Sequence, residues 1–558
     1  MSIWLPLIFS IIRPVARVAT AKFFFLCLLA LLIPGLATAG VELLRIDSGP
    51  VVQTEDGVYK GIPYAAPPVG ALRWRPPQPV VPWTEARDMD AFGPVCPQPE
   101  ADGESNEDCL TLNVWTPARA PDEKLPVMVF IHGGAFLMGA GSLPLYDGEA
   151  LALQGVVLVT LNYRLGALGF MAHPLLSAES PTGASGNYGL LDQQAALAWV
   201  RRNIAAFGGD STNVTVFGQS AGAASIVMQL LSPQAGALFD RAIVQSPVAP
   251  GSLRPLKRAA HGALPPVLSA EEIGLRIARR FGSEKTGDAL AALRAANADD
   301  VIKAGMDPAG LGAKAALEVA GLVCGPVVDG VVIPEHPVAR IRQGQQHKKP
   351  LIVGVTTNEA SLFLPGLIPP VDSQKSYRRM VEERFGAQAG KVLALLPGNK
   401  GRLWSDLDRL ITVRWFEAFS SFLAREWLKA GLPCWLYRFD MPLPWLALEL
   451  LAMEAGAGDI SREKAGVAHS AEIFPLFGFQ PWYLGFDDAD RDFAKSFRSY
   501  WTRFAATGDP NNNAAPSWPR YDASAPKRLQ FGKTIEVRPA PEDALYPLVE
   551  ASWQTTLY

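Results

Sequence analysis

Residues 214–222 read VTVFGQSAG and decide the fold, because they place a serine between two glycines where a strand pattern meets a helix pattern. The apolar run at 214–217 is typical of a buried strand, and the small and apolar residues at 221–231 are typical of a buried helix. In a G-x-S-x-G turn the serine takes a strained backbone conformation, and the residues two positions away must be glycine to allow the close approach. We therefore predict that Ser220 stands clear of a sheet edge, where its hydroxyl can act as a nucleophile.

The stretches around this turn alternate between apolar strands bounded by Gly or Pro and helical patterns. This alternation predicts an α/β fold with a large, mostly parallel central sheet covered by helices on both faces. Residues 250–320 interrupt the pattern and are expected to form an insertion over the sheet. The predicted strands are 127–131, 156–161, 214–217, 241–245, 350–355 and 434–439, and the predicted helices are 192–205, 221–231, 271–281, 288–295, 406–429 and 489–507.

The composition of the 558-residue chain is that of a folded protein with a large core. It is 49% hydrophobic and 19% charged, with a formal net charge of -3. Such a balance gives no electrostatic reason to bind nucleic acid or anionic lipid. No linker or repeat marks a second domain, so we expect a single domain over residues 40–558.

The first 39 residues have the pattern of an export signal. Three basic side chains precede an apolar run at 23–33, and residues 37–39 (ATA) match a small-x-small cleavage site, which predicts cleavage after Ala39. The run is shorter than the ~20 apolar residues that a membrane span needs. We therefore expect a secreted or periplasmic protein without stable membrane insertion after cleavage; an uncleaved N-terminal membrane anchor is the alternative.

A serine nucleophile needs a histidine base, and the chain has six histidines. In this type of fold the triad follows the chain order serine, acid, histidine, which excludes His132 and His173. His469 lies in an irregular stretch after the strand at 434–439, and it is the only histidine after Glu359. We predict that His469 is the base. The remaining histidines lie in irregular or hydrophilic stretches: His261, His336 and His347.

Two acids compete for the role of orienting the histidine. Glu359 follows the end of the strand at 350–355, at the sheet edge where the sites of open α/β folds assemble. Asp329 precedes a glycine between two apolar runs, which is a hairpin signal and favours a local backbone role. We therefore predict Glu359 as the triad acid.

The transition state also needs amide donors for a developing oxyanion. Residues 132–136 read HGGAF directly after the strand at 127–131, as in the HGG-type loops of lipases and esterases. We predict that the backbone amides of Gly134, Ala135 and Ala221 form the oxyanion hole.

Several segments together resemble the type-B carboxylesterase family of α/β-hydrolases, which includes bacterial para-nitrobenzyl esterases, animal carboxylesterases and cholinesterases. They span most of the mature chain and include 61–65 (GIPYA), 107–115 (EDCLTLNVW), 186–193 (GNYGLLDQ) and 207–222. The resemblance implies the α/β-hydrolase fold with cap insertions. It also implies a triad and an oxyanion hole made of the residues predicted above: Ser220, Glu359 and His469, with Gly134, Ala135 and Ala221.

The resemblance implies further features of the site and its surroundings. It implies a disulfide between Cys96 and Cys109, and supporting positions for Ser246 and Glu472 beside the histidine. Cys324 and Cys434 lie in apolar segments and are expected to be buried thiols. Metal or redox chemistry is not expected, because none of the five cysteines falls in a C-x-x-C pair.

Two departures from the family bear on the substrate. Cholinesterases bind a quaternary ammonium on a tryptophan between the first two disulfide cysteines, but residues 97–108 contain no aromatic residue here. Gln219 precedes the nucleophile where cholinesterases carry a glutamate. We therefore expect a carboxylesterase that acts on uncharged, fairly apolar small-molecule esters without a cofactor. The alternatives are an amidase or peptidase of the same fold, or a non-catalytic binding protein; the oligomeric state stays open.

Overall fold

The computed structural model describes residues 43–555 except 53–56, 100–104, 251–252, 258–267, 283–286, 307–323, 367–369, 458–459 and 512–515. The predicted export signal with its cleavage site after Ala39, and also His261, lie outside the described residues. The chain from Leu43 to Tyr558 clusters as one compact unit.

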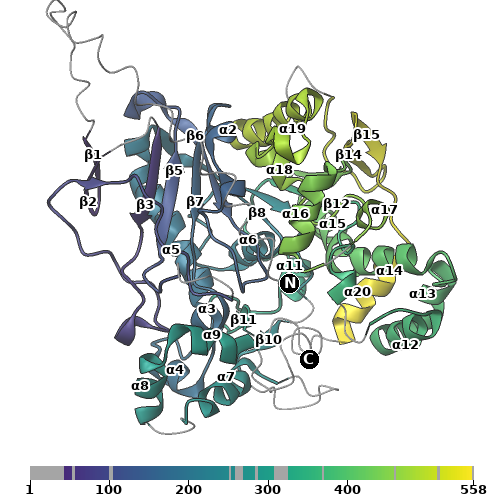
Figure 1. Ribbon diagram of the computed structural model, residues 1–558, viewed down its shortest axis with the longest axis horizontal. Coiled ribbons are helices and arrows are strands. Elements are labelled where there is room, and N and C mark those ends of the chain that lie inside the picture. The colour runs from purple at the N-terminus through teal and green to yellow at the C-terminus, as the bar shows by residue number, and fades with distance from the viewer. Residues whose placement is uncertain are drawn as a thin grey trace, which may run out of the picture. The chain divides into compact units, whose positions relative to one another are not determined.

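A mixed sheet of ten strands runs through the described part of the chain (Figure 1). Seven neighbouring strands, from β7 to β14, are parallel, and the strands at both edges are antiparallel to their neighbours. This confirms the predicted α/β architecture. In spatial order the strands are β15 (Ile535–Pro539), β14 (Lys527–Phe531), β13 (Cys434–Phe439), β12 (Leu351–Thr356), β9 (Arg241–Gln245), β8 (Gly209–Gln219), β6 (Leu125–Ile131), β7 (Val157–Leu161), β5 (Thr111–Trp115) and β3 (Val58–Pro63).

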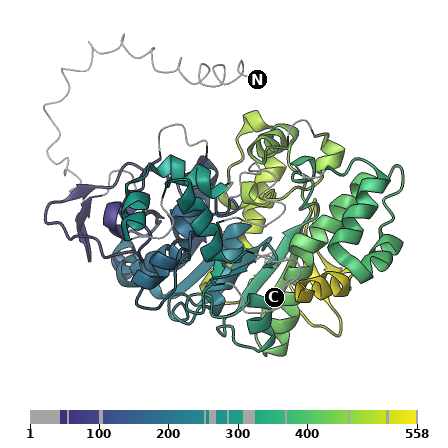
Figure 2. The same ribbon diagram turned by 90° about the horizontal axis from the view of Figure 1, so that it is seen from below.

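Helices cover both faces of this sheet (Figures 1 and 2). No described helix is both long enough and apolar enough to cross a membrane. The described helices are α2 (Glu149–Ala152), α3 (Gly166–Phe170), α4 (Pro174–Glu179), α5 (Tyr188–Asn203), α6 (Ala221–Leu231), α7 (Ala270–Arg279), α8 (Gly287–Ala295), α9 (Ala298–Met306), α11 (Pro337–Arg342), α12 (Gln374–Phe385), α13 (Ala389–Leu395), α14 (Leu403–Thr412), α15 (Ala418–Lys429), α16 (Trp445–Glu454), α17 (Arg462–Ala465), α18 (Ile473–Phe477), α19 (Asp488–Thr507) and α20 (Leu545–Thr555).

Successive side chains of the buried strands enter two different cores. In β6, Val127, Val129 and Ile131 pack into the core that also contains residues of α5, α6 and α15. Met128 and Phe130 pack on the opposite face, with residues of α18 and α19. Because side chains alternate across a strand and both faces are covered, each central strand is a continuous apolar run.

The insertion predicted for residues 250–320 contains α7, α8 and α9. These helices gather with α4 in Figure 1, and α9 packs against α3. A second group, formed by α12, α13, α14 and α20, also lies together.

Two local predictions need correction. The helix predicted over 406–429 is α14 and α15 joined by a π-helical turn at Val413–Glu417. Asp329 forms a turn, in which its carboxylate accepts from the amides of Val331 and Ile333, but no strand hairpin. Instead β11 (Val327–Val328) pairs in parallel with β10 (Arg254–Pro255).

The N-terminal strands and the disulfide are not part of the predicted alternation of strands and helices. A separate small sheet contains β1 (Leu43–Ile46), β2 (Gly49–Val52) and β4 (Arg87–Asp88). Cys96 and Cys109 form the disulfide that the family resemblance implied. Cys324 and Cys434 are free and buried, as predicted.

Removing this disulfide should lower the stability of the folded chain. The bond closes a loop with a sequence separation of 13, so the chain-entropy cost of folding the Cys96→Ala/Cys109→Ala variant is about 3 kcal/mol higher than that of the bridged protein. Urea unfolding followed by tryptophan fluorescence should show a lower midpoint, and reductant should bring the wild type to that same midpoint. Equal midpoints for the variant and the oxidised wild type would contradict the prediction.

Candidate active site

Ser220 occupies the strained turn that the sequence predicts. It lies between the end of β8 at Gln219 and the start of α6 at Ala221, with φ 59° and ψ -122°. Non-glycine residues rarely adopt such a conformation, and they keep it only where the surrounding structure enforces it. The helix α6 begins directly behind the serine, so its N-terminal amides face the region in front of the hydroxyl.

The two glycines of the motif are required by close packing against the end of β6. A Cβ on Gly222 would lie 1.9 Å from the carbonyl oxygen of Ile131, and a Cβ on Gly218 would lie 2.6 Å from the same atom. No side chain fits at such distances. The strain at Ser220 is therefore imposed by backbone contacts on both sides of it.

His469 and Glu359 are in direct contact although they lie 110 residues apart. The Nδ1 atom of His469 faces the Oε2 atom of Glu359 in a short hydrogen bond, and both side chains are buried. Glu359 follows β12, and His469 lies between α17 and α18. Because the carboxylate can only accept, the ring carries its proton on Nδ1 and leaves a lone pair on Nε2.

The carboxylate of Glu359 has two further donors at its other oxygen. The amide of Thr356 donates to Oε1 at 2.6 Å, and the hydroxyl of Ser246 donates to the same atom at 2.6 Å. Ser246 follows β9 and has a positive φ of 52°, so its backbone is also strained. These bonds hold the carboxylate in one orientation toward the histidine.

Glu472 lies behind this pair as a second buried acid. Its Oε1 atom is 3.5 Å from the hydroxyl of Ser246. Burial, and next the nearby charge of Glu359, raise the pKa of Glu472 to about 8. The group is therefore mostly protonated at neutral pH, which keeps two negative charges from meeting at one buried site.

The loop predicted to hold the oxyanion turns sharply at successive residues. Gly134, Ala135 and Phe136 have φ values of 98°, 58° and 61°. A Cβ on Gly133 would lie 3.2 Å from the Cβ atom of Ser220, so the loop passes directly beside this serine. The imidazole of His132 stacks on Tyr163 with ring centroids 4.4 Å apart, and burial lowers its pKa to about 4.

His173, His336 and His347, which were not predicted to be the base, have hydrogen bonds to backbone atoms. His173 and His336 cap the N-termini of α4 and α11. His347 lies in a hydrophilic stretch, but it is half-buried, with Nε2 2.7 Å from the carbonyl oxygen of Ser232. None of these three contacts involves Glu359.

Sequence reasoning missed Asn358, which links the loop of Glu359 to the loop of His469. Its backbone amide donates to the carbonyl of Val467 at 2.9 Å, and its Oδ1 accepts from the amide of Val467 at 3.0 Å. Its Nδ2 donates to Asp408 of α14 at 2.8 Å. No sequence signal would have identified this contact, because an asparagine after a strand usually marks an ordinary turn.

Aromatic side chains form the immediate surroundings of the histidine. Phe416, in the π-helical turn, and Phe363 have ring centroids 4.8 Å and 5.3 Å from that of His469. Trp415 packs on Phe363, and these two rings are only half-buried. The side of the histidine formed by these rings is therefore apolar.

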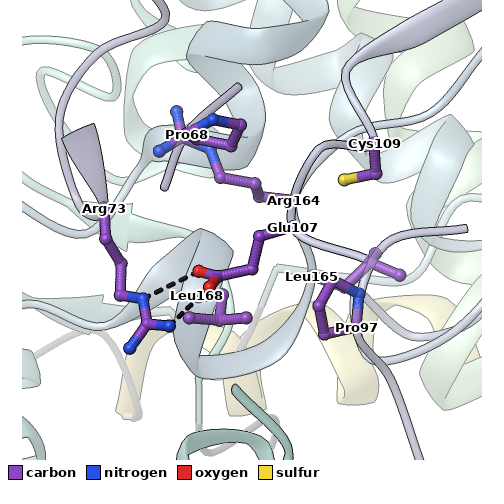
Figure 3. Close-up of a pocket in the computed structure, with 8 residues that line it drawn as sticks. All are labelled: Pro68, Arg73, Pro97, Glu107, Cys109, Arg164, Leu165 and Leu168. Carbon is purple, nitrogen blue, oxygen red and sulfur yellow. Dashed lines mark hydrogen bonds and ion pairs between the residues drawn. The ribbon is translucent and has the colours of Figure 1, made fainter. Parts of the chain in front are cut away.

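A small pocket elsewhere has none of these residues in its lining. It lies beside Cys109 and contains Arg73, whose guanidinium is paired with Glu107 (Figure 3). Arg164, at its rim, is paired with Asp192 at 2.6 Å. Both guanidinium groups in its lining are therefore already paired with a carboxylate.

The chain that carries this strained serine and this acid–histidine pair was compared with known proteins. The family model described as "Carboxylesterase family" matches residues 48–544. The chain belongs to the carboxylesterase family. It is therefore a carboxylic ester hydrolase with the α/β-hydrolase fold.

Relatives and solved structures agree with this membership. Fumonisin B1 esterase of Sphingopyxis macrogoltabida is 36% identical over 93% of this chain and 92% of its own length. Para-nitrobenzyl esterase of Bacillus subtilis is 36% identical over 88% of this chain and 94% of its own length. A solved PNB esterase structure superposes with a TM-score of 0.75 at 33% identity, covering 91% of this chain and all 100% of that one.

The raised pKa of Glu472 should make stability depend on pH in a predictable direction. Between its ordinary value of 4.5 and about 8 the unfolded chain has lost this proton while the folded chain keeps it, so its contribution to stability is lost as pH rises. Glu472→Gln removes that loss. The free energy of unfolding should be measured with urea at pH 5 and at pH 8 for both proteins. The difference between the variant and the wild type should increase by more than about 1 kcal/mol, in favour of the variant, from pH 5 to pH 8. A difference that is the same at both pH values would rule this out.

Proposed function

We propose that the enzyme hydrolyses uncharged, fairly apolar carboxylic esters through an acyl-enzyme formed on Ser220. The contact between Glu359 and Nδ1 of His469 carries this proposal. The strained backbone of Ser220, and the contact of the preceding residue Gln219 with the ring of His469, support it. In these roles Glu359 orients the ring, His469 is the base and Ser220 is the nucleophile.

The first half of the reaction forms the acyl-enzyme. The hydroxyl of Ser220 attacks the ester carbonyl while its proton passes to Nε2 of His469. The imidazolium is stabilised by the carboxylate of Glu359, which stays ionised throughout. The tetrahedral intermediate collapses when the same proton moves from Nε2 to the leaving alkoxide.

The carbonyl oxygen becomes negative during this attack and needs preorganised donors. We assign this role to the backbone amides of Gly134, Ala135 and Ala221. The positive φ values of Gly134 and Ala135, and the position of Ala221 at the start of α6, support the assignment. Losing one such donor typically costs 10² to 10³ in rate.

The second half of the reaction restores the enzyme. Water takes the place of the alcohol, His469 accepts its proton, and the hydroxide attacks the acyl carbonyl. The acid is released when Ser220 recovers the proton from His469. Apart from water, neither half calls for a cofactor.

The side chains near the histidine favour apolar substrates. Phe363 and Trp415 are half-buried beside the ring, and both offer hydrophobic contact to an acyl or alcohol group. The names of two relatives, para-nitrobenzyl esterase and fumonisin B1 esterase, describe ester hydrolysis, which agrees with this class of reaction.

The site of action that fits the chain best is outside the cytoplasm. We propose that residues 1–39 direct export and are removed after Ala39, which leaves a single domain over 40–558. The disulfide between Cys96 and Cys109 supports this, because such bonds persist in oxidising compartments.

Replacing the proposed nucleophile should abolish turnover without unfolding the protein. Ser220→Ala is expected to lose all but a trace of activity on a p-nitrophenyl ester, and Glu359→Gln is expected to lose about 10⁴ in kcat because the ring is then held in the wrong tautomer. An organophosphate should label Ser220 in the wild type, as read by peptide mass. A folded Ser220→Ala enzyme with wild-type turnover would refute the proposal.

The chain-length preference of the enzyme tests the apolar contact. Across p-nitrophenyl esters of increasing acyl length, kcat/KM should rise until the acyl group exceeds the available contact. Phe363→Ala should reduce this rise, while acetate ester turnover changes little, because burial of each CH₂ contributes about 0.8 kcal/mol. A parallel fall for all esters would mean that the ring only supports His469.

A further inference from the structure

The side chain of Gln219 contacts the catalytic base from the residue next to the nucleophile. Its amide nitrogen Nε2 lies 2.9 Å from Nε2 of His469, and the side chain is buried, with 4% of the residue exposed. On its other side, a Cβ placed on Gly133 would lie 3.1 Å from its Oε1 atom. Gln219 therefore lies between the base and the loop proposed to bind the oxyanion.

The direction of this hydrogen bond follows from the acid on the far side of the ring. Glu359 requires the ring proton on Nδ1, so Nε2 of His469 has only its lone pair to offer. An amide NH₂ group has only donors. Gln219 therefore donates to the lone pair that must also receive the proton of Ser220.

We propose that Gln219 is a positioning residue that holds the ring of His469 neutral in the free enzyme and yields Nε2 to Ser220 when the ester is attacked. The inference rests on the roles proposed above for Ser220 and His469. It assigns to Gln219 no contact with the reacting atoms of the substrate.

A donor to Nε2 has two opposite effects on the reaction. It stabilises the neutral ring, because the imidazolium has a proton on Nε2 and can no longer accept the bond. It also competes with the serine hydroxyl for the single lone pair. As the proton passes from Ser220 to Nε2 and on to the leaving alkoxide, the amide of Gln219 must turn away, and it gains or loses no proton itself.

The identity of residue 219 should therefore set the pH range of the enzyme. A donor at this position extends activity to lower pH, because the base stays unprotonated there. A carboxylate would do the reverse, since it attracts and accepts from the imidazolium.

Other titratable groups lie on the elements packed around the ring, and they must be separated from this effect. Burial raises the pKa of Asp408 to about 6, which falls in the range where the acid limb of a histidine-dependent rate is expected. The rings of Phe363 and Phe416 that contact His469 carry no charge. In the described part of the chain, the titratable groups that contact His469 or interact electrostatically with Glu359 include Glu359 itself, Glu472, Asp408 and Tyr437.

The test compares two variants of nearly equal size with the wild type. Gln219→Met removes the donor, and Gln219→Glu replaces it with the acid that cholinesterases carry at this position. The midpoint of the acid limb of kcat/KM on p-nitrophenyl acetate should rise by about half a pH unit to one unit in the Met variant. It should rise by about one to three units in the Glu variant.

A second measurement follows the ring without turnover. In the Ser220→Ala background, the imidazole signal of His469 is followed by NMR as a function of pH. The signal is assigned by its absence from the spectrum of the His469→Gln variant. The midpoint of this titration should be lowest with Gln219, higher in the Gln219→Met variant and highest in the Gln219→Glu variant. Repeating the series with Asp408→Asn removes the titration of that acid, and the order should persist.

The outcomes separate this inference from the function on which it rests. A midpoint that is unchanged or lower in the Gln219→Met protein, by both kinetics and NMR, overturns the role of Gln219. If Ser220→Ala keeps turnover, the proposed function fails, while the NMR titration still decides whether Gln219 holds the ring neutral. A Met variant that loses rate equally at all pH values has only lost packing, and this also overturns the inference.

Discussion

The contact between the carbonyl oxygen of Ile131 and the two glycines of the elbow is the constraint on which the site depends. Gly218 and Gly222 leave no room for a side chain beside that oxygen, so β6 fixes the bend of the chain around Ser220. The same strand continues into the HGGAF loop, whose residue Gly133 lies against the nucleophile. One backbone segment therefore positions both the serine and the amides proposed to stabilise its intermediate.

Much of the fold could be predicted from local patterns. Strands buried on both faces are continuous apolar runs, and this is why β6, β7, β9, β12 and β13 were found within a residue or two of their observed limits. The elbow motif also carries its own structural context, since the strand β8 and the helix α6 lie on either side of it. Chain order then left His469 as the base, and the structure brings it to Glu359.

Other features could not be read from the sequence, because they depend on contacts between distant segments. The π-helical turn at Val413–Glu417 has the apolar pattern of an ordinary helix, but it brings Phe416 to the ring of His469. The local backbone role predicted for Asp329 is confirmed by its bonds to Val331 and Ile333, but the strand before it, Val327–Val328, pairs in parallel with Arg254–Pro255 and not in a hairpin. In the sequence, Gln219 differs from the glutamate of cholinesterases, but nothing there predicts its contact with His469. That contact forms only when the segments of Gln219 and His469 are folded together.

The bonds of Asn358 to Val467 have a consequence for how this enzyme can evolve. They join the two loops largely through main-chain atoms, and they lie directly beside Glu359 and His469. The helices α12 and α13 lie between these two loops in the chain, but they pack with each other, α14 and α20. They can therefore diverge in length and composition while the spacing of Glu359 and His469 is kept.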